Sequence, residues 1–102
     1  MNRKEFLEAA EAIISGKEYG APEDNFAFIA DLWNAYDKSK TNKYDTAHDV
    51  AIKMALLKIA RIGGGKHKDD NYIDLIGYGA CAGAIGKDEE MTETVNLDER
   101  GK

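Results

Sequence analysis

The sequence predicts an all-α fold of four helices on three observations. Apolar residues recur with the 3.6-residue spacing of a helix in four separate segments. Glycine-rich or polar turn segments divide these four, and no stretch alternates between apolar and polar residues as a half-buried strand does. We therefore expect a four-helix bundle with helices over residues 2–15, 22–37, 47–62 and 70–86.

The first two predicted helices each carry one apolar face. Residues 2–15 repeat apolar side chains at helical spacing, and Gly16 ends the repeat. Pro22 suits the first turn of the second helix, where Glu23 and Asp24 lie beside the positive end of the helix dipole. Both helices are predicted to be amphipathic.

The third and fourth predicted helices differ from these in composition. Residues 49–62 are apolar nearly all round, so we expect the third helix to be central, with a weak capping box of Thr46 and Asp49 at its start. Three glycines end it. An aspartate caps the fourth helix, whose small residues in GYGACAGAIG allow another backbone to approach closely. The spacing leaves open whether that backbone belongs to the same chain.

The composition suits one compact domain, predicted at residues 1–86, followed by a polar, acidic C-terminal tail at residues 87–102. An apolar central helix and a small-residue face on the fourth predict a homo-oligomer, at least a dimer. Cys81, the one cysteine, is predicted to be a packed residue in a reducing compartment. The predicted core comprises Phe6, Ile13, Phe26, Ile29, Trp33, Met54, Leu57, Ile73 and Ile76.

The charge balance narrows the classes of partner. The 14 basic and 19 acidic residues give a net charge of -5, which argues against general binding to nucleic acid or to an anionic membrane. No apolar run approaches the ~20 residues of a membrane span. The start of the sequence has no hydrophobic signal segment. We therefore expect a soluble cytoplasmic protein.

Two cations, Lys58 and Arg61, interrupt the apolar third helix. The short glycine-rich turn after them should set the third and fourth helices antiparallel, so that residues equidistant from the turn face each other. Arg61 then lies near Asp70 or Asn71, and Lys58 lies near Asp74. The predicted polar cluster is Lys58, Arg61, Asp70, Asn71, Asp74 and Tyr78.

This cluster has two interpretations. Interhelical salt bridges would satisfy its charges without any ligand. A nucleotide would instead place its phosphates on the Arg and Lys side chains, with Asn and Asp bonding hydroxyls or a base edge and Tyr stacking on the base. Lys66 and Lys68 add positive charge where the fourth helix presents its N-terminal amides to an anion. His48 and His67 form no metal site by spacing, and no catalytic nucleophile is indicated.

Three stretches, EAAEAIISGKEYGAPEDNFAFIADLW, HDVAIKMALLKIARI and HKDDNYIDLIGYGACA, resemble a family of small bacteriophage and prophage proteins over about residues 5–85. Members are often labelled distant relatives of the MazG-like all-α nucleotide pyrophosphohydrolases. The resemblance implies a MazG-like bundle, a place in the cytoplasm of an infected or lysogenic bacterium, and a ligand site that also includes Tyr19 and Asn25. Its sharpest motifs are Tyr19-Gly20, Asn25-Phe26, Lys58-x-x-Arg61 and Asp70-x-x-x-Asp74 with Tyr78.

The chain departs from the enzyme pattern at the metal ligands. In MazG-like enzymes an E-x-x-E on one helix and an E-x-x-D on the next hold magnesium at the triphosphate. The corresponding positions here read Lys58-x-x-Arg61 and Asn71-x-x-Asp74, so one carboxylate of the four remains. Two cations at the place of metal ligands repel magnesium and suit phosphates directly. The resemblance therefore implies nucleotide binding more than hydrolysis.

Three functions follow from these readings. We favour capture of an anionic nucleotide without hydrolysis, and with no catalytic residue, metal or cofactor; a phage could use it to sequester a nucleotide second messenger of host immunity. The alternative is a magnesium-dependent pyrophosphohydrolase of nucleoside triphosphates. It would need Asp70 and Asp74, with Glu18, Glu23 or Asp24, around the metal. A structural or protein-interaction module would need only the salt bridges.

Overall fold

The computed structural model describes residues 1–15 and 21–100, with side chains through residue 90, and contains four helices and no strand in these ranges. The prediction of an all-helical fold with four helices is confirmed. The helices are α1 (Arg3–Ser15), α2 (Pro22–Ser39), α3 (Ala47–Gly64) and α4 (Asp69–Arg100).

One helix boundary was predicted wrongly. The fourth helix was expected to end near residue 86, and α4 continues to Arg100. The segment after Gly86 is polar, and its four glutamates, together with Lys87, Met91, Leu97 and Arg100, have high helix propensity, which favours continuation of the helix. The division into a domain at residues 1–86 and a tail at residues 87–102 stays a prediction.

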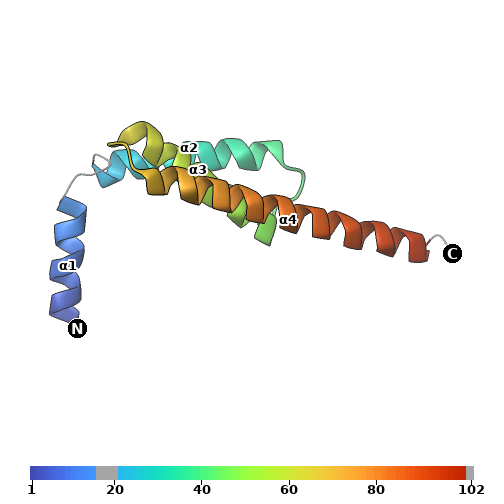
Figure 1. The fold of residues 1–102 in the computed structure, drawn as a ribbon, viewed down its shortest axis with the longest axis horizontal. Helices are drawn as coiled ribbons and strands as arrows, with labels where there is room; N and C mark the ends of the chain where they lie inside the picture. Colours follow the sequence, from blue (N-terminus) through green and yellow to red (C-terminus); the bar gives the residue numbers. More distant parts are fainter. Residues whose placement is uncertain (16–20, 101–102) are drawn as a thin grey trace.

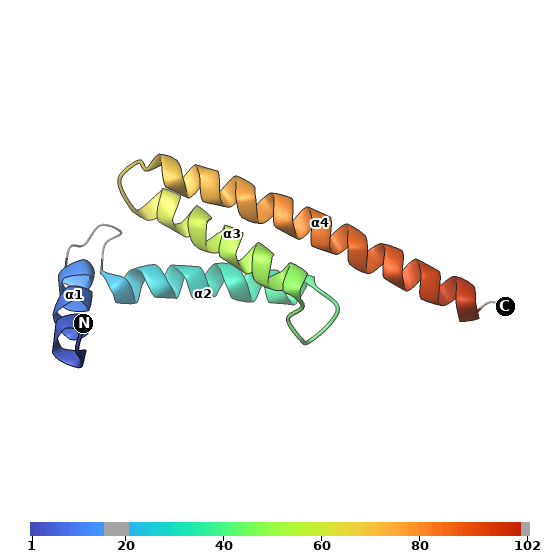
Figure 2. The same ribbon diagram turned by 60° about the horizontal axis from the view of Figure 1, so that its bottom comes forward.

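Three of the helices pack together, and α1 stands apart from them (Figure 1). The largest contact joins α3 to α4, which run antiparallel on either side of the glycine-rich turn, and α2 packs against α3 (Figure 2). Every residue of α1 is exposed. The expected bundle of four packed helices is therefore wrong in its first member, because no other described helix covers the apolar face of α1.

The buried core consists mainly of small side chains. Ala51, Ala55 and Ala60 of α3 and Ala82 of α4 are buried with Ile29 of α2. Alanines at these positions let the helix axes approach closely, but each buries little apolar surface. The chain is accordingly elongated, with principal extents of 61 × 33 × 26 Å.

The predicted core is only partly correct. Ile29 is buried, whereas Trp33, Met54 and Leu57 are half-buried. The other five predicted core residues are exposed, because they lie on helix faces that no described helix covers. These five are Phe6, Ile13, Phe26, Ile73 and Ile76. Cys81 is exposed as well, contrary to its prediction.

None of the helices in the described ranges combines the length and the apolar character needed to cross a bilayer.

Candidate functional site

The polar cluster predicted from the sequence lies between α3 and α4. Lys58 of α3 and Asp74 of α4 form an ion pair, with 2.8 Å between Nζ and Oδ2. This confirms the predicted position of Lys58 opposite Asp74. The Lys58 side chain is 12% exposed and the Asp74 side chain 45%, so water reaches the carboxylate more than the ammonium.

Asn71 occupies the inner face of the first turn of α4. It is 3% exposed, and its Nδ2 has no hydrogen-bond partner among the described residues. Its backbone N–H donates to the carbonyl of Lys68 at 3.1 Å, which closes the turn into α4. A buried amide left without an acceptor costs about 1–3 kcal/mol of stability. Such a group in a folded protein is satisfied by an ordered water, an ion or a ligand.

The remaining members of the cluster differ in burial. Arg61 and Tyr78 are half-buried, each one helical turn from a member of the Lys58–Asp74 pair. Asp70 is exposed, so Asn71 rather than Asp70 faces α3. We call the five inward residues the hairpin cluster: Lys58, Arg61, Asn71, Asp74 and Tyr78.

The turn between α3 and α4 carries the two further predicted ligands. Lys66 is exposed and Lys68 is half-buried. Next to them His67 Nε2 lies 2.9 Å from Asp69 Oδ1, and the His67 ring lies against the Tyr72 ring with 5.3 Å between centroids. The turn therefore places basic and aromatic groups beside the first amides of α4.

Asn25 lies away from the hairpin cluster, beside a hollow of about 260 Å³ between the start of α2 and the end of α3. None of the hairpin-cluster residues lines this hollow. A ligand site that includes Asn25 together with Lys58 stays a prediction. Tyr19 and Glu18 lie outside the described residues. The hollow is lined by Asp24, Asn25, Phe28, Ala60, Gly63 and Gly64.

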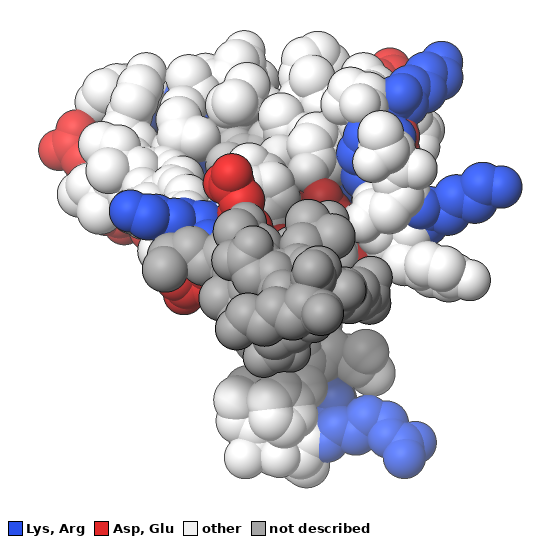
Figure 3. All heavy atoms as spheres, turned by 90° about the vertical axis from the view of Figure 1, so that its right-hand side faces the viewer, with Lys and Arg blue, Asp and Glu red and all other residues white. Residues whose placement is uncertain are grey.

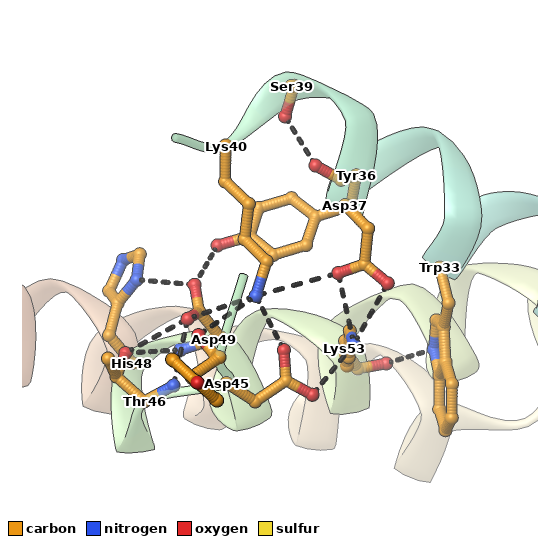
Figure 4. Close-up of polar contacts among 11 residues, drawn as sticks. Trp33, Tyr36, Asp37, Ser39, Lys40, Asp45, Thr46, His48, Asp49 and Lys53 are labelled. Carbon is orange, nitrogen blue, oxygen red and sulfur yellow. Dashed lines mark hydrogen bonds and ion pairs between the residues drawn. The ribbon is translucent and has the colours of Figure 1, made fainter. Parts of the chain in front are cut away.

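A second polar cluster, which sequence reasoning missed, lies where the loop after α2 meets the start of α3 (Figure 4). Lys40 Nζ lies 2.6 Å from Asp45, 3.4 Å from Asp49 and 3.6 Å from Asp37. Lys53 Nζ lies 2.8 Å from Asp45 and 3.1 Å from Asp37. We call these five residues the loop cluster.

Asp49 anchors the loop cluster to the start of α3. Its carboxylate is buried, accepts hydrogen bonds from Thr46 N at 2.8 Å and Tyr36 Oη at 2.6 Å, and completes the predicted capping box with Thr46. The Thr46 backbone N–H, then the Tyr36 hydroxyl, hold the pKa of Asp49 well below its usual range. Burial, then the hydrogen bond to Asp49, raises the pKa of Tyr36 to about 12.

The two lysines of the loop cluster are also held in their charged form. The hydrogen bond to Asp45 is the main cause that raises the pKa of each, and the Lys40 hydrogen bond lowers the pKa of Asp45 in return. Trp33 also connects α2 to α3, because its Nε1 donates a hydrogen bond to the Lys53 carbonyl at 2.8 Å. The loop cluster combines two cations with three carboxylates, and each of these five ionised groups has an opposite partner within the cluster.

Two further features of the described residues concern metal sites and basic surfaces. Among the described residues, no group of three or more His, Cys, Asp or Glu side chains is arranged to hold a metal ion. On the face shown in Figure 3, the described basic side chains stand apart from one another, with acidic side chains between them. These described side chains form no continuous basic surface of the kind that binds nucleic acid backbones.

Comparison with known proteins finds a family and two relatives. A family described as "Domain of unknown function (DUF6378)" matches residues 5–86. The "Gene 55 protein" of Mycobacterium phage L5 is 40% identical over 84 residues, which cover 79% of this chain and 50% of the relative. That of Mycobacterium phage D29 is 38% identical over 82 residues, 78% of this chain and 52% of the relative. The chain thus spans about half the length of these relatives, and no solved structure matches it significantly.

Proposed function

The chain belongs to the DUF6378 family and is related to proteins of two mycobacteriophages, and we propose that it captures an anionic nucleotide without hydrolysing it. The observation that carries this proposal is the buried Asn71 amide, whose Nδ2 lacks an acceptor among the described residues. Phosphate and sugar oxygens are strong acceptors, so a nucleotide bound in the hairpin cluster would satisfy this donor.

The hairpin cluster has the chemistry for such a ligand. The Arg61 guanidinium matches two phosphate oxygens at once, and Lys58 supplies a compact positive charge. Lys58 can exchange Asp74 for phosphate at small cost, because the 45% exposed Asp74 carboxylate then turns to water. Tyr78 can stack on a base, while Lys66, Lys68 and the first amides of α4 attract an anion at the turn.

The MazG-like architecture and magnesium-dependent hydrolysis stay predictions. Hydrolysis would need several carboxylates around one metal, yet Asp74 is paired with Lys58 and Asp70 points outward. Asp24 lines the hollow, which none of the hairpin-cluster residues lines. In a phage-infected cell, the capture of a nucleotide second messenger of host immunity would be an anti-defence activity, and the proposed ligand class includes such messengers.

The test is calorimetric titration with a panel of nucleoside triphosphates and cyclic dinucleotides, first in EDTA and then in magnesium. We expect at least one nucleotide to bind in EDTA and to be recovered intact. Lys58→Ala and Arg61→Ala should each weaken that binding at least tenfold, whereas Lys38→Ala, an exposed lysine on α2, should leave it unchanged. If the protein released pyrophosphate in the presence of magnesium and Asp74→Ala abolished that release, the function would be hydrolysis and not capture.

The substitution Asn71→Leu distinguishes a ligand-binding role of Asn71 from a purely structural role. Leucine has nearly the same volume and removes the unpartnered donor, so the free energy of unfolding should rise by about 1–3 kcal/mol while nucleotide binding falls. A purely structural Asn71 would show the opposite, a loss of stability. That loss, together with no binding across the panel, would refute the proposal.

A further inference from the structure

The side of α4 that faces away from α3 is an uncovered apolar strip (Figure 2). Ile73 is 62% exposed and Ile76 is 72% exposed, although both are large aliphatic residues. Further along the same side the exposed residues are small. They are Gly77, Ala80, Cys81, Gly83 and Ala84.

Packing within the chain does not account for these small residues. A Cβ atom added at Gly77 or Gly83 would meet nothing within 4 Å. The opposite side of α4, which includes the buried Asn71 and Ala82, is the one that packs on α3. Because the small residues on this side of α4 make no contact within the described part of the chain, the surface is suited to close packing of a helix from another molecule.

The exposed area of the chain agrees with an absent partner. The chain exposes 7883 Å², where a compact monomer of 11.2 kDa exposes about 5,700 Å². The excess of about 2,000 Å², to which the uncovered α1 also contributes, is well above the ~800 Å² that each partner of a standard interface buries. The radius of gyration of 18.3 Å likewise exceeds the ~13 Å of a compact chain of this length.

We propose that α4 pairs antiparallel with α4 of a second copy of this chain along the strip. The large residues lie toward the start of the strip and the small ones toward its end. In an antiparallel pair each large half therefore meets a small half, whereas a parallel pair would set isoleucine against isoleucine and leave gaps between glycines.

Charge and symmetry support the same arrangement. With the two-fold axis between positions 78 and 79, Ile73 lies opposite Ala84 and Ile76 opposite Cys81 of the second copy. Exposed Asp70 near the start of α4 then lies opposite exposed Lys87 of the second copy. Both contacts recur twice, as a self-complementary two-fold interface requires. The hairpin cluster lies on the other side of α4, so this proposal does not depend on nucleotide binding.

The first test is the mass in solution by light scattering at micromolar concentration, without ligand. We expect twice the 11.2 kDa chain mass for the wild type and the single mass for Ala80→Glu, with unchanged helical circular dichroism. Phe6→Glu is the matched control, because Phe6 is 60% exposed on α1 and should remain dimeric. A monomeric wild type, or dissociation by Phe6→Glu and not by Ala80→Glu, would overturn the proposal.

The second test fixes the direction of the pair. Ile76→Cys leaves native Cys81 in place, and oxidation followed by peptide mapping should link position 76 of one copy to Cys81 of the other. Bonds between identical positions would indicate a parallel pair and contradict the proposal. A dimer without any cross-link would contradict the proposed register.

Discussion

The loop cluster and the hairpin cluster are both built from lysines and aspartates on neighbouring helices, yet their charges are matched differently. In the loop cluster Lys40 and Lys53 share three carboxylates, and Asp49 is additionally held by the capping box of α3. In the hairpin cluster Lys58 pairs with a half-exposed Asp74, beside the buried Asn71 amide whose Nδ2 has no acceptor among the described residues.

The difference indicates which cluster stabilises the fold and which can bind a ligand. A network whose charges are all paired internally gains little from an ionic ligand, since the ligand would first have to displace those internal partners. A cluster with an unfilled donor gains from a ligand that supplies an acceptor. Substitutions in the loop cluster should therefore affect stability, and those in the hairpin cluster should affect binding.

Asp49→Ala is expected to have the largest effect on stability. The substitution removes a buried carboxylate that accepts from Thr46 N and Tyr36 Oη, and it leaves Lys40 with fewer counter-charges. Loss of one partner of a buried charge network costs about 3 kcal/mol or more. Urea unfolding followed by far-UV circular dichroism measures it. Asp31→Ala, on the exposed side of α2, is the control and should change stability by less than about 0.5 kcal/mol.

Asp49 also predicts how stability depends on acid. Its folded pKa lies below the unfolded value of about 4, so its contribution is complete above that pH and is lost as the pH falls. The melting temperature of the wild type should drop below about pH 4, and the drop should be shallower in Asp49→Asn. An equally steep drop in that variant would assign the acid sensitivity to other carboxylates.

Tyr36→Phe should have an intermediate effect, a loss of about 1.5 kcal/mol, because it removes one hydrogen bond to a charged acceptor. The distance of 2.6 Å between Tyr36 Oη and Asp49 Oδ1 is that of a strong bond. Chemical denaturation at neutral pH measures the loss.

Tyr36→Phe should also change how the stability depends on pH in alkaline solution. The pKa of Tyr36 is raised to about 12, above the unfolded value of about 10. Its contribution is therefore complete below pH 10 and is lost as the pH rises toward 12. The stability gap between wild type and Tyr36→Phe should narrow over that range. A gap that stays constant would mean that the hydroxyl contributes nothing through Asp49.

The hairpin cluster could be predicted from the sequence, whereas the loop cluster could not. The three glycines at the end of α3 lead into a short antiparallel connection, and that geometry sets Lys58 opposite Asp74. Lys40, Asp45 and Lys53 meet because an irregular loop folds back on α3, and no helical period or turn rule encodes that path. Only the capping pair, Thr46 and Asp49, was visible in advance.

The core, too, could be predicted only in part from the sequence. Helical periodicity correctly indicated apolar faces around Phe6 on α1 and Ile73 on α4, but it does not say what covers them. Within this chain those faces are open, and small alanines such as Ala60 occupy the contacts between helices instead. The length of α4 was missed for a related reason, because a polar segment was taken for a tail although its residues favour a helix.

Lys58→Ala should lower stability by less than about 1 kcal/mol, since the carboxylate it leaves behind reaches water. Loss of one partner of a fully buried ion pair costs about 3–5 kcal/mol, but the Asp74 side chain is 45% exposed. Thermal unfolding of Lys58→Ala beside Asp49→Ala compares the two clusters directly. A loss as large as that of Asp49→Ala would mean that both clusters hold the fold.

The smallest expected effect concerns the point where the loop cluster touches α4. A Cβ at Gly86 would lie 3.1 Å from Cδ2 of His48, the neighbour of Asp49, whereas one at Gly63 of α3 would meet nothing within 4 Å. Alanine in place of a helical glycine gains about 0.5–1 kcal/mol, so Gly63→Ala should show this gain. Gly86→Ala should show less, because the His48 ring must shift by a few tenths of an ångström. Removing the ring with His48→Ala should restore the gain in the double variant. Equal gains at both glycines would mean that the ring moves freely and that α4 is not coupled to the loop cluster through His48.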